Sequence, residues 1–300
     1  MSRVMVDARG LAAGYGKKEK VIRGLNFTLA SGLIHGLIGE NGAGKTTLLR
    51  VLAGQLHYEG ELRVFGVDPF DNPTVLDRTI LAGIDAPLPG SWSPRKLMAV
   101  AAARYNSWNE GRALELSKRF ELPFGKAYSS LSRGQKSATS LVLAIASGCE
   151  LLLLDEPYLG LDLRKREEFY RILREEMDRG GRTILLSTHH LHESEKLLDT
   201  VLYLKAGEVR INGPAHELSE QILEVFGAAE EVERLLRQLG SVPELRREEI
   251  SIGRRSIIDL REQPALADAA YDLAHQIGGR LRVSGITLEQ AVLAMSGEKR

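Results

Sequence analysis

The sequence predicts an α/β protein with a parallel sheet whose strands are joined by helical crossovers. Short apolar strands alternate with helical segments over residues 21–211, which is typical of parallel sheets. One apolar strand, residues 33–38, leads into a glycine-rich turn and then a helix. Another, residues 151–154, ends in two adjacent carboxylates. Because open α/β sheets bind ligands at the carboxyl ends of their strands, we expect the functional site at that edge.

The first 213 residues are expected to form one domain in three parts. The first part, residues 1 to about 70, is expected to consist of strands and turns around a helix at 46–52, with strands at 21–29, 33–38 and 61–65, and to include an N-terminal antiparallel β subdomain. A proline-rich stretch and a strand near 80–84 precede the second part, a helical subdomain of about residues 90–147 with helices at 96–104, 110–120 and 134–146. The third part completes the sheet, with strands at 151–154, 183–187, 200–204 and 207–211 and helices at 164–178 and 191–198.

Residues 214–300 are expected to form a small α+β extension, because the composition shifts near Gly213 and Pro214. Its predicted elements are helices at 228–239, 264–276 and 287–295, a hairpin over 250–261 that turns at 253–255, and a strand at 280–283. The role of this extension is open; docking, dimer support and ligand sensing are the alternatives.

Composition narrows the class of protein. Forty basic and forty acidic residues cancel, so no global field draws the chain to nucleic acid or to a membrane. No run is long and apolar enough to span a bilayer, and residues 1–7 have no secretory apolar core. The single Cys149 cannot form an internal disulfide, which suits a reducing cytoplasm.

The glycine-rich turn fits a phosphate-binding loop. Residues 39–46 read Gly-x-x-x-x-Gly-Lys-Thr, and glycines let such a loop curl its N–H groups toward phosphate oxygens. Lys45 is expected to reach the β and γ phosphates, and the Thr46 hydroxyl to ligate Mg²⁺. An ordinary glycine-rich turn is the alternative, but it has no need of a Lys-Thr pair followed by a helix. The expected ATP-binding residues here are Gly39, Glu40, Asn41, Gly42, Ala43, Gly44, Lys45, Thr46 and Thr47.

The carboxylates after residues 151–154 are a second candidate site. Asp155 is suited to hold Mg²⁺ directly or through water, and Glu156 to polarise the water that attacks the γ phosphate. A solvated acidic turn is the alternative, and the phosphate-binding loop favours the functional interpretation. Together the two motifs indicate a P-loop NTPase core.

Residues 131–135, Leu-Ser-Arg-Gly-Gln, open a helix before the acidic strand. With the two preceding motifs they make the chain similar to the ATP-binding subunit of ABC transporters, whose signature is Leu-Ser-Gly-Gly-Gln. Arg133 stands at the third position, which varies in that family. The resemblance implies that Ser132, Arg133, Gly134 and Gln135 form the signature, and that Ser132 and Gly134 contact the γ phosphate of ATP bound to an opposite subunit. A capping serine that begins a helix is compatible with this role.

Three further positions resemble family motifs. His189, after Ser187 and Thr188, resembles the switch histidine that contacts the γ phosphate, which makes it the second expected catalytic residue beside Glu156. Asp162 resembles the D-loop aspartate, expected at the dimer interface. Tyr15, between Gly14 and Gly16, resembles the aromatic residue that stacks on adenine, although a turn tyrosine is the alternative.

One family residue has no counterpart. The family usually has a glutamine after the strand near residues 80–84, whereas this chain has none between Gln55 and Gln135. Asp85 is the best-placed substitute. We expect it to ligate Mg²⁺ together with Thr46 and Asp155.

The resemblance implies an ATPase that needs ATP and Mg²⁺ and sandwiches two ATP molecules in a homodimer or heterodimer. It further implies a separate integral membrane permease, so that the subunit is cytoplasmic and lies at the inner face of the cell membrane. Residues 105–108, 120–123 and 285–290 resemble ATPases of bacterial ABC-2-type exporters, so export is expected over import. A soluble ATPase acting on nucleic acid or ribosomes is the rival class. The single P-loop and the neutral charge argue against it, and no nucleic-acid partner is expected.

Overall fold

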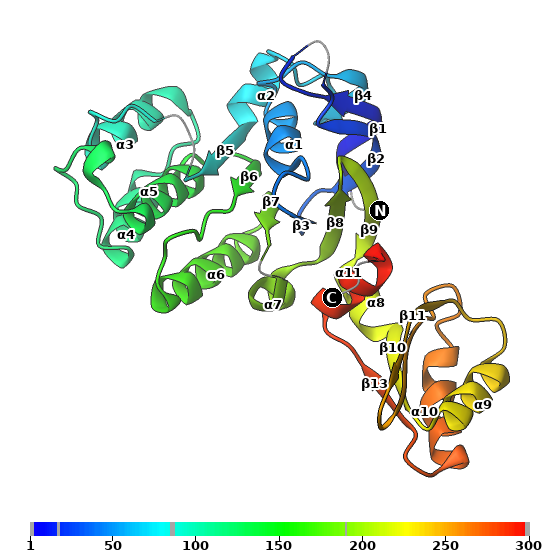
Figure 1. The fold of residues 1–300 in the computed structure, drawn as a ribbon. Coiled ribbons are helices and arrows are strands. Elements are labelled where there is room, and N and C mark those ends of the chain that lie inside the picture. The colour runs from blue at the N-terminus through cyan, green and yellow to red at the C-terminus, as the bar shows by residue number, and fades with distance from the viewer. Residues whose placement is uncertain (1–2, 17–18, 85–87, 190, 298–300) are drawn as a thin grey trace. The chain divides into compact units, whose positions relative to one another are not determined.

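The computed structural model describes residues 3–16, 19–84, 88–189 and 191–297. The chain divides into two compact units (Figure 1). The first comprises residues 1–189 and 202–209, and the second residues 190–201 and 210–300. Each unit has its own hydrophobic core.

The first unit is organised around a sheet whose strand order is β5-β6-β7-β3-β8-β9. These strands are β3 (Ile34–Gly39), β5 (Thr79–Gly83), β6 (Leu151–Asp155), β7 (Thr183–Thr188), β8 (Thr200–Lys205) and β9 (Glu208–Pro214). The pairs β5–β6, β6–β7 and β7–β3 are parallel. Every residue of β3 and β7 is buried, as expected for parallel strands covered on both faces. The predicted α/β fold with a parallel core is therefore confirmed.

A second, antiparallel sheet packs into the same core. Its strand order is β2-β1-β4, from β1 (Val4–Ala13), β2 (Ile22–Ala30) and β4 (Glu59–Val64). Alternate residues of β2, such as Leu25, Phe27 and Leu29, are buried, which is the period of a strand with one face on the core. This confirms the predicted N-terminal antiparallel β subdomain, but its middle strand, β1, was not predicted. Helix α1 (Lys45–Leu52) contributes Leu48, Leu49 and Leu52 to the core between the sheets.

Helices follow in the next part of the chain. They are α2 (Pro73–Arg78), α3 (Pro94–Arg104), α4 (Glu110–Arg119), the 3₁₀ turn η1 (Tyr128–Ser130), α5 (Arg133–Ala146) and α6 (Leu163–Asp178). Asn72, Ser93 and Asn109 cap the first three with side-chain acceptors, as residues with short polar side chains do. Ion pairs tie α4 to α6, because Arg112 and Arg119 of α4 both contact Glu175 of α6.

The second unit contains a β-α-β-β-α-β motif. Its sheet has the order β11-β12-β10-β13 and is antiparallel throughout, with β10 (Ile222–Gly227), β11 (Glu244–Ile250), β12 (Gly253–Asp259) and β13 (Arg282–Gly285). Helices α9 (Ala229–Leu239) and α10 (Leu266–Ile277) share a core with it. The other elements are α7 (Leu191–Ser194), η2 (Glu195–Leu197), α8 (Ala215–Glu220) and α11 (Leu288–Ser296).

The predicted details of this unit need three corrections. The hairpin turns at residues 251–252, not at 253–255, because Ile250 pairs with Gly253. Strands β10 and β11 and helix α8 were not predicted. The sequence of β11 is ELRREEI, in which five of seven side chains are charged. It therefore has no apolar run that would indicate a strand. The predicted helix at 191–198 is a four-residue α-helix followed by a 3₁₀ turn.

Candidate nucleotide-binding site

The loop between β3 and α1 has a backbone that only glycine can adopt at its last position. Gly44 has φ of 104°, and a Cβ added there would lie 2.6 Å from Cγ2 of Ile22. Both the conformation and the lack of space therefore exclude a side chain. The loop consequently delivers Lys45 as the first residue of α1.

Lys45 is held inside this loop. Its Nζ donates to the carbonyl oxygens of Gly39, at 2.7 Å, and Glu40, at 3.1 Å. It also lies 3.7 Å from Oε1 of Glu156. The residue is only 6% exposed, and burial lowers the pKa of its amine from the ordinary lysine value, although Glu156 and Asp155 oppose that effect. A cation in a poorly hydrated place attracts an anion more strongly than one in bulk water does.

Two side chains whose oxygens can bind a metal ion, Thr46 and Asp155, meet beside Lys45. The Thr46 hydroxyl donates to Oδ2 of Asp155 at 2.6 Å, and the Ser187 hydroxyl donates to Oδ1 of the same carboxylate at 2.9 Å. Asp155 is the last residue of β6 and lies opposite Ser187 in the parallel pairing of β6 with β7. Hydroxyl and carboxylate oxygens suit Mg²⁺, which is usually bound by one or two carboxylates together with substrate phosphates. The donor set of Thr46 and Asp155 therefore fits that ion.

Glu156 and His189 extend from the ends of the same two strands. Nδ1 of His189 lies 3.0 Å from Oε1 of Glu156. Glu156 is 16% exposed and His189 36%, so the pair borders solvent. Glu156 has φ of 45°, which is a strained left-handed conformation for a non-glycine residue. Such strain is common where a side chain must point into a site.

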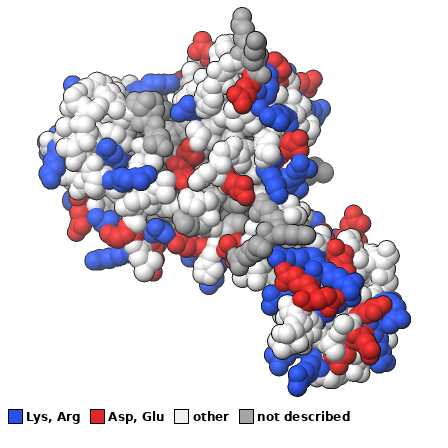
Figure 2. Space-filling model, viewed as in Figure 1, with Lys and Arg blue, Asp and Glu red and all other residues white. Residues whose placement is uncertain are grey.

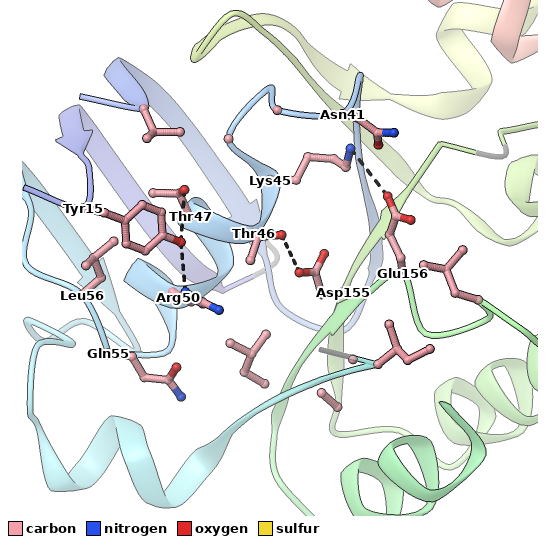
Figure 3. Close-up of a pocket in the computed structure, with 18 residues that line it drawn as sticks. Tyr15, Asn41, Lys45, Thr46, Thr47, Arg50, Gln55, Leu56, Asp155 and Glu156 are labelled. Carbon is pink, nitrogen blue, oxygen red and sulfur yellow. Dashed lines mark hydrogen bonds and ion pairs between the residues drawn. The ribbon is translucent and has the colours of Figure 1, made fainter. Parts of the chain in front are cut away.

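Lys45, Thr46, Asp155 and Glu156 line a cavity of about 690 Å³ (Figure 3). The predicted catalytic residue His189 contacts Glu156 but lies outside the described lining of this cavity, as does Ser187. Of the predicted residues, the lining contains Tyr15, Asn41, Gly42, Gly44, Lys45, Thr46, Thr47, Asp155 and Glu156. Sequence reasoning missed Val21, Arg50, Gln55, Leu56, Leu81, Ala82, Gly83, Ile84 and Leu159. Arg50 could have been found, because it follows Thr46 by four residues and so lies on the same face of α1. The others come from separate segments and carry no local signal.

Tyr15 lies at the far end of this cavity from Glu156 (Figure 3). It is 57% exposed. Its hydroxyl accepts from NH1 of Arg50 at 3.2 Å, and the Arg50 guanidinium carbon lies 5.6 Å from the centroid of its ring. An aromatic ring that is largely open to solvent at the rim of a cavity can stack on a flat ligand.

Gly39, Glu40 and Ala43 belong to the loop but not to the cavity lining, as far as the described residues show. Their backbone shapes the loop, since the Ala43 N–H donates to the Glu40 carbonyl at 3.1 Å. Asp85, the predicted third magnesium ligand, falls outside the described residues.

The predicted signature begins α5. The Ser132 hydroxyl accepts from the Gln135 N–H at 3.2 Å, while the Gln135 side chain accepts from the Ser132 N–H at 3.0 Å, which is a capping box. A Cβ on Gly134 would lie 2.4 Å from the carbonyl oxygen of Gly160. The start of α5 therefore packs directly on the loop that leads to Asp162, which caps α6 by accepting from the Lys165 N–H at 2.9 Å. Ser132, Arg133, Gly134, Gln135 and Asp162 all lie outside the described lining of the cavity.

Comparisons with known proteins identify the family. The family model described as ABC transporter matches residues 22–159. Nod factor export ATP-binding protein I of Rhizobium sp. (strain N33) is 32% identical over 266 residues, which cover 84% of this chain and 84% of that protein. The daunorubicin/doxorubicin resistance ATP-binding protein DrrA of Streptomyces peucetius is 33% identical over 229 residues, or 72% of this chain and 67% of DrrA.

The fold agrees with these relatives. A dimeric ATP-binding cassette solved in a post-hydrolysis state with ADP and Pi superposes with a TM-score of 0.61 at 22% identity, over 70% of this chain and 99% of that chain. The chain therefore belongs to the ATP-binding proteins of ABC transporters, and it is an ATPase. Within the described residues, no helix combines the length and the apolarity needed to cross a membrane.

Proposed function

We propose that this protein is the ATP-hydrolysing subunit of an exporter, that it dimerises around two ATP molecules, and that it drives a separate membrane permease from the cytoplasmic face. One observation carries the proposal: Lys45, the Thr46–Asp155 pair and Glu156 converge on one end of one cavity, and His189 contacts Glu156 there. The export function of the relative from Rhizobium sp. (strain N33) favours export over import.

Within one subunit, the cavity places ATP by charge and shape. Tyr15 stacks on the adenine, and Lys45 with the loop N–H groups holds the phosphates. Thr46 and Asp155 would hold Mg²⁺, with Asp85 as an additional ligand. The ion would supply positive charge beside the phosphate oxygens.

Hydrolysis is assigned to Glu156 and His189. Glu156 accepts a proton from the attacking water, and His189 orients Glu156 through the contact between its Nδ1 and Oε1 of the carboxylate. Lys45, 3.7 Å from the same carboxylate oxygen, turns to the phosphates when they bind. Positioned groups of this kind account for most of the catalysis of phosphoryl transfer.

The signature and the D-loop act on a second subunit. Ser132, Gly134 and Asp162 lie away from the cavity of their own chain, which supports a role at the nucleotide of a partner. ATP then joins two faces, and loss of the γ phosphate removes the contacts that hold them together. The dimeric state of the solved cassette is consistent with this arrangement.

A soluble ATPase that acts on nucleic acid is the second candidate function. On the face seen in Figure 2, basic and acidic side chains are interspersed, and the net charge of the chain is zero. Strong sequence-independent binding to nucleic acid needs a cluster of basic residues that releases counterions. This charge pattern favours the transporter subunit.

Binding and hydrolysis can be tested separately with two variants of the purified chain. Lys45→Ala is expected to weaken ATP binding at least tenfold, because it removes the cation that faces the phosphates; Lys118→Ala, on the exposed face of α4, is the matched control. Glu156→Gln is expected to keep ATP affinity within about threefold and to lower kcat at least 100-fold. Nucleotide titration and phosphate release measure the two quantities. Unchanged ATP affinity in Lys45→Ala would reject the site, and normal turnover in Glu156→Gln would reject the catalytic assignment.

A further inference from the structure

A buried tyrosine connects the two strands that carry Glu156 and His189. Tyr158 follows Glu156 by two residues and is fully buried. Its hydroxyl lies 2.8 Å from Oγ1 of Thr188 and accepts from the backbone N–H of His189 at 3.3 Å. Thr188 is the last residue of β7 and His189 follows it. The hydroxyl therefore contacts the point at which the chain leaves β7.

Packing fixes the ring of Tyr158 in this position. Its centroid lies 6.4 Å from the Phe169 ring of α6 and 6.3 Å from the imidazole of His189. The Tyr158 carbonyl accepts from the Leu161 N–H at 3.0 Å, which fixes the backbone on the way to the D-loop. Because β6 and β7 are neighbours in the sheet (Figure 1), a short rigid link suffices to join their ends. A buried hydroxyl has no water to replace these partners.

We propose that Tyr158 is a positioning residue for hydrolysis, which acts by holding the backbone of His189 at the distance from Glu156 that the reaction requires. The inference rests on the proposed roles of Glu156 and His189. Glu156 is placed by the chain, since it stands two residues before Tyr158 in the sequence, and His189 is placed by the Tyr158 hydroxyl. The Tyr158 hydroxyl thus links the end of β7 to the segment that carries Glu156, and so helps to set a pair whose atoms lie 3.0 Å apart.

Tyr158→Phe removes the hydroxyl and keeps the ring. The His189 N–H then loses an acceptor, and His189 can move relative to Glu156. We expect kcat for ATP hydrolysis to fall about tenfold, because a misplacement of about 1 Å costs up to 10²-fold in rate. The KM for ATP should change by less than twofold, since Tyr15, Lys45 and Thr46 are untouched. Tyr105→Phe removes another tyrosine hydroxyl outside the cavity lining and is the matched control, with kcat and KM unchanged.

A double-mutant cycle tests whether Tyr158 acts through His189. Phosphate release is measured for the wild type, Tyr158→Phe, His189→Ala and the double variant, with thermal unfolding of each to establish that it is folded. The inference expects Tyr158→Phe to cause no further loss in the His189→Ala background, because the group it positions is already absent.

The outcomes separate this inference from the proposed function. An unchanged kcat in Tyr158→Phe, or the same tenfold loss in both backgrounds, overturns the positioning role and leaves the assignment of His189 standing. Full activity of His189→Ala overturns the catalytic role of His189, and the inference falls with it. The inference is supported if Tyr158→Phe lowers kcat only when His189 is present, and if the KM for ATP is preserved.

Discussion

At the scale of single residues, two glycines let the predicted signature and the predicted D-loop approach each other closely. Gly134 of the signature and Gly160 of the D-loop have no space for a side chain, because a Cβ on Gly134 would meet the Gly160 carbonyl oxygen at 2.4 Å. The clash is with backbone, which a rotamer change cannot relieve. The spacing of the two loops is therefore built into the sequence.

Gly134→Ala is expected to force these two loops apart. We expect a loss of about 1–3 kcal/mol in unfolding free energy, the usual range for overpacking a filled site, and a fall in ATPase activity of at least tenfold. Gly125→Ala is the control, since nothing lies within 4 Å of its added Cβ. Urea unfolding and phosphate release measure both effects, and wild-type values for Gly134→Ala would contradict the close packing.

The sequence predicted those site residues that belong to contiguous motifs. Lys45 and Thr46 directly follow one glycine-rich loop, and Asp155 and Glu156 stand at the end of one apolar strand, so local spacing was enough to propose them. Arg50 and Tyr158 were missed for different reasons. Arg50 could have been predicted only by asking which residues share the face of α1 that carries Thr46. The partners of Tyr158 are about thirty residues away in sequence and meet it only in the folded sheet.

At the scale of elements, α4 is attached to α6 by charged side chains. Arg119 contacts Glu168 and Glu175, and Arg112 contacts Glu175 and Glu176. Arg112 and Glu176 are buried, so each charge depends on its partners. This network joins α4 to α6, the helix that Asp162 caps at its first turn.

The ion pairs between α4 and α6 make the free energy of unfolding depend on pH over a defined range. The Arg119 guanidinium lowers the pKa of Glu175 from 4.5 to about 2. A carboxyl with a lowered pKa in the folded state stabilises the protein above its unfolded pKa, and this contribution is lost as the pH falls from about 4.5 to about 2.

Glu175→Gln removes this titration. The wild type should exceed the variant in unfolding free energy at pH 7, and the difference should shrink steadily below pH 4.5. Denaturant unfolding at several pH values measures it, with the exposed Glu61→Gln on β4 as a control that should follow the wild type. A difference that stays constant down to pH 2 would contradict the ion-pair origin.

The helices and strands differ in how well they can be predicted from the sequence. Strands β3, β6 and β7 are rich in apolar residues and almost entirely buried, and all three were predicted. Strand β11 is charged along its length, lies at the edge of its sheet and gains its structure from pairing with β12. Tertiary pairing overrides local pattern at such an edge, so no reading of residues 244–250 alone would find it.

At the scale of the whole molecule, the sequence predicted a division at residue 213. The structure gathers residues 190–201 with the later part of the chain. Within that unit the N–H of Leu288, at the start of α11, donates to Oε1 of Glu195 at 2.9 Å. These partners are far apart in sequence, and composition alone cannot connect them. We propose that residues 190–201 and the β-α-β-β-α-β module of residues 214–300 belong to one folding unit.

We propose that ATP joins two copies of the chain and that its cleavage releases them. Light scattering can measure the mass of Glu156→Gln in solution, first with ATP and Mg²⁺ and then with ADP and Mg²⁺. We expect a dimer with ATP and a monomer with ADP, and no ATP-dependent dimer when Lys45→Ala is added. A monomer under every condition, or a dimer that ignores the nucleotide, would contradict it.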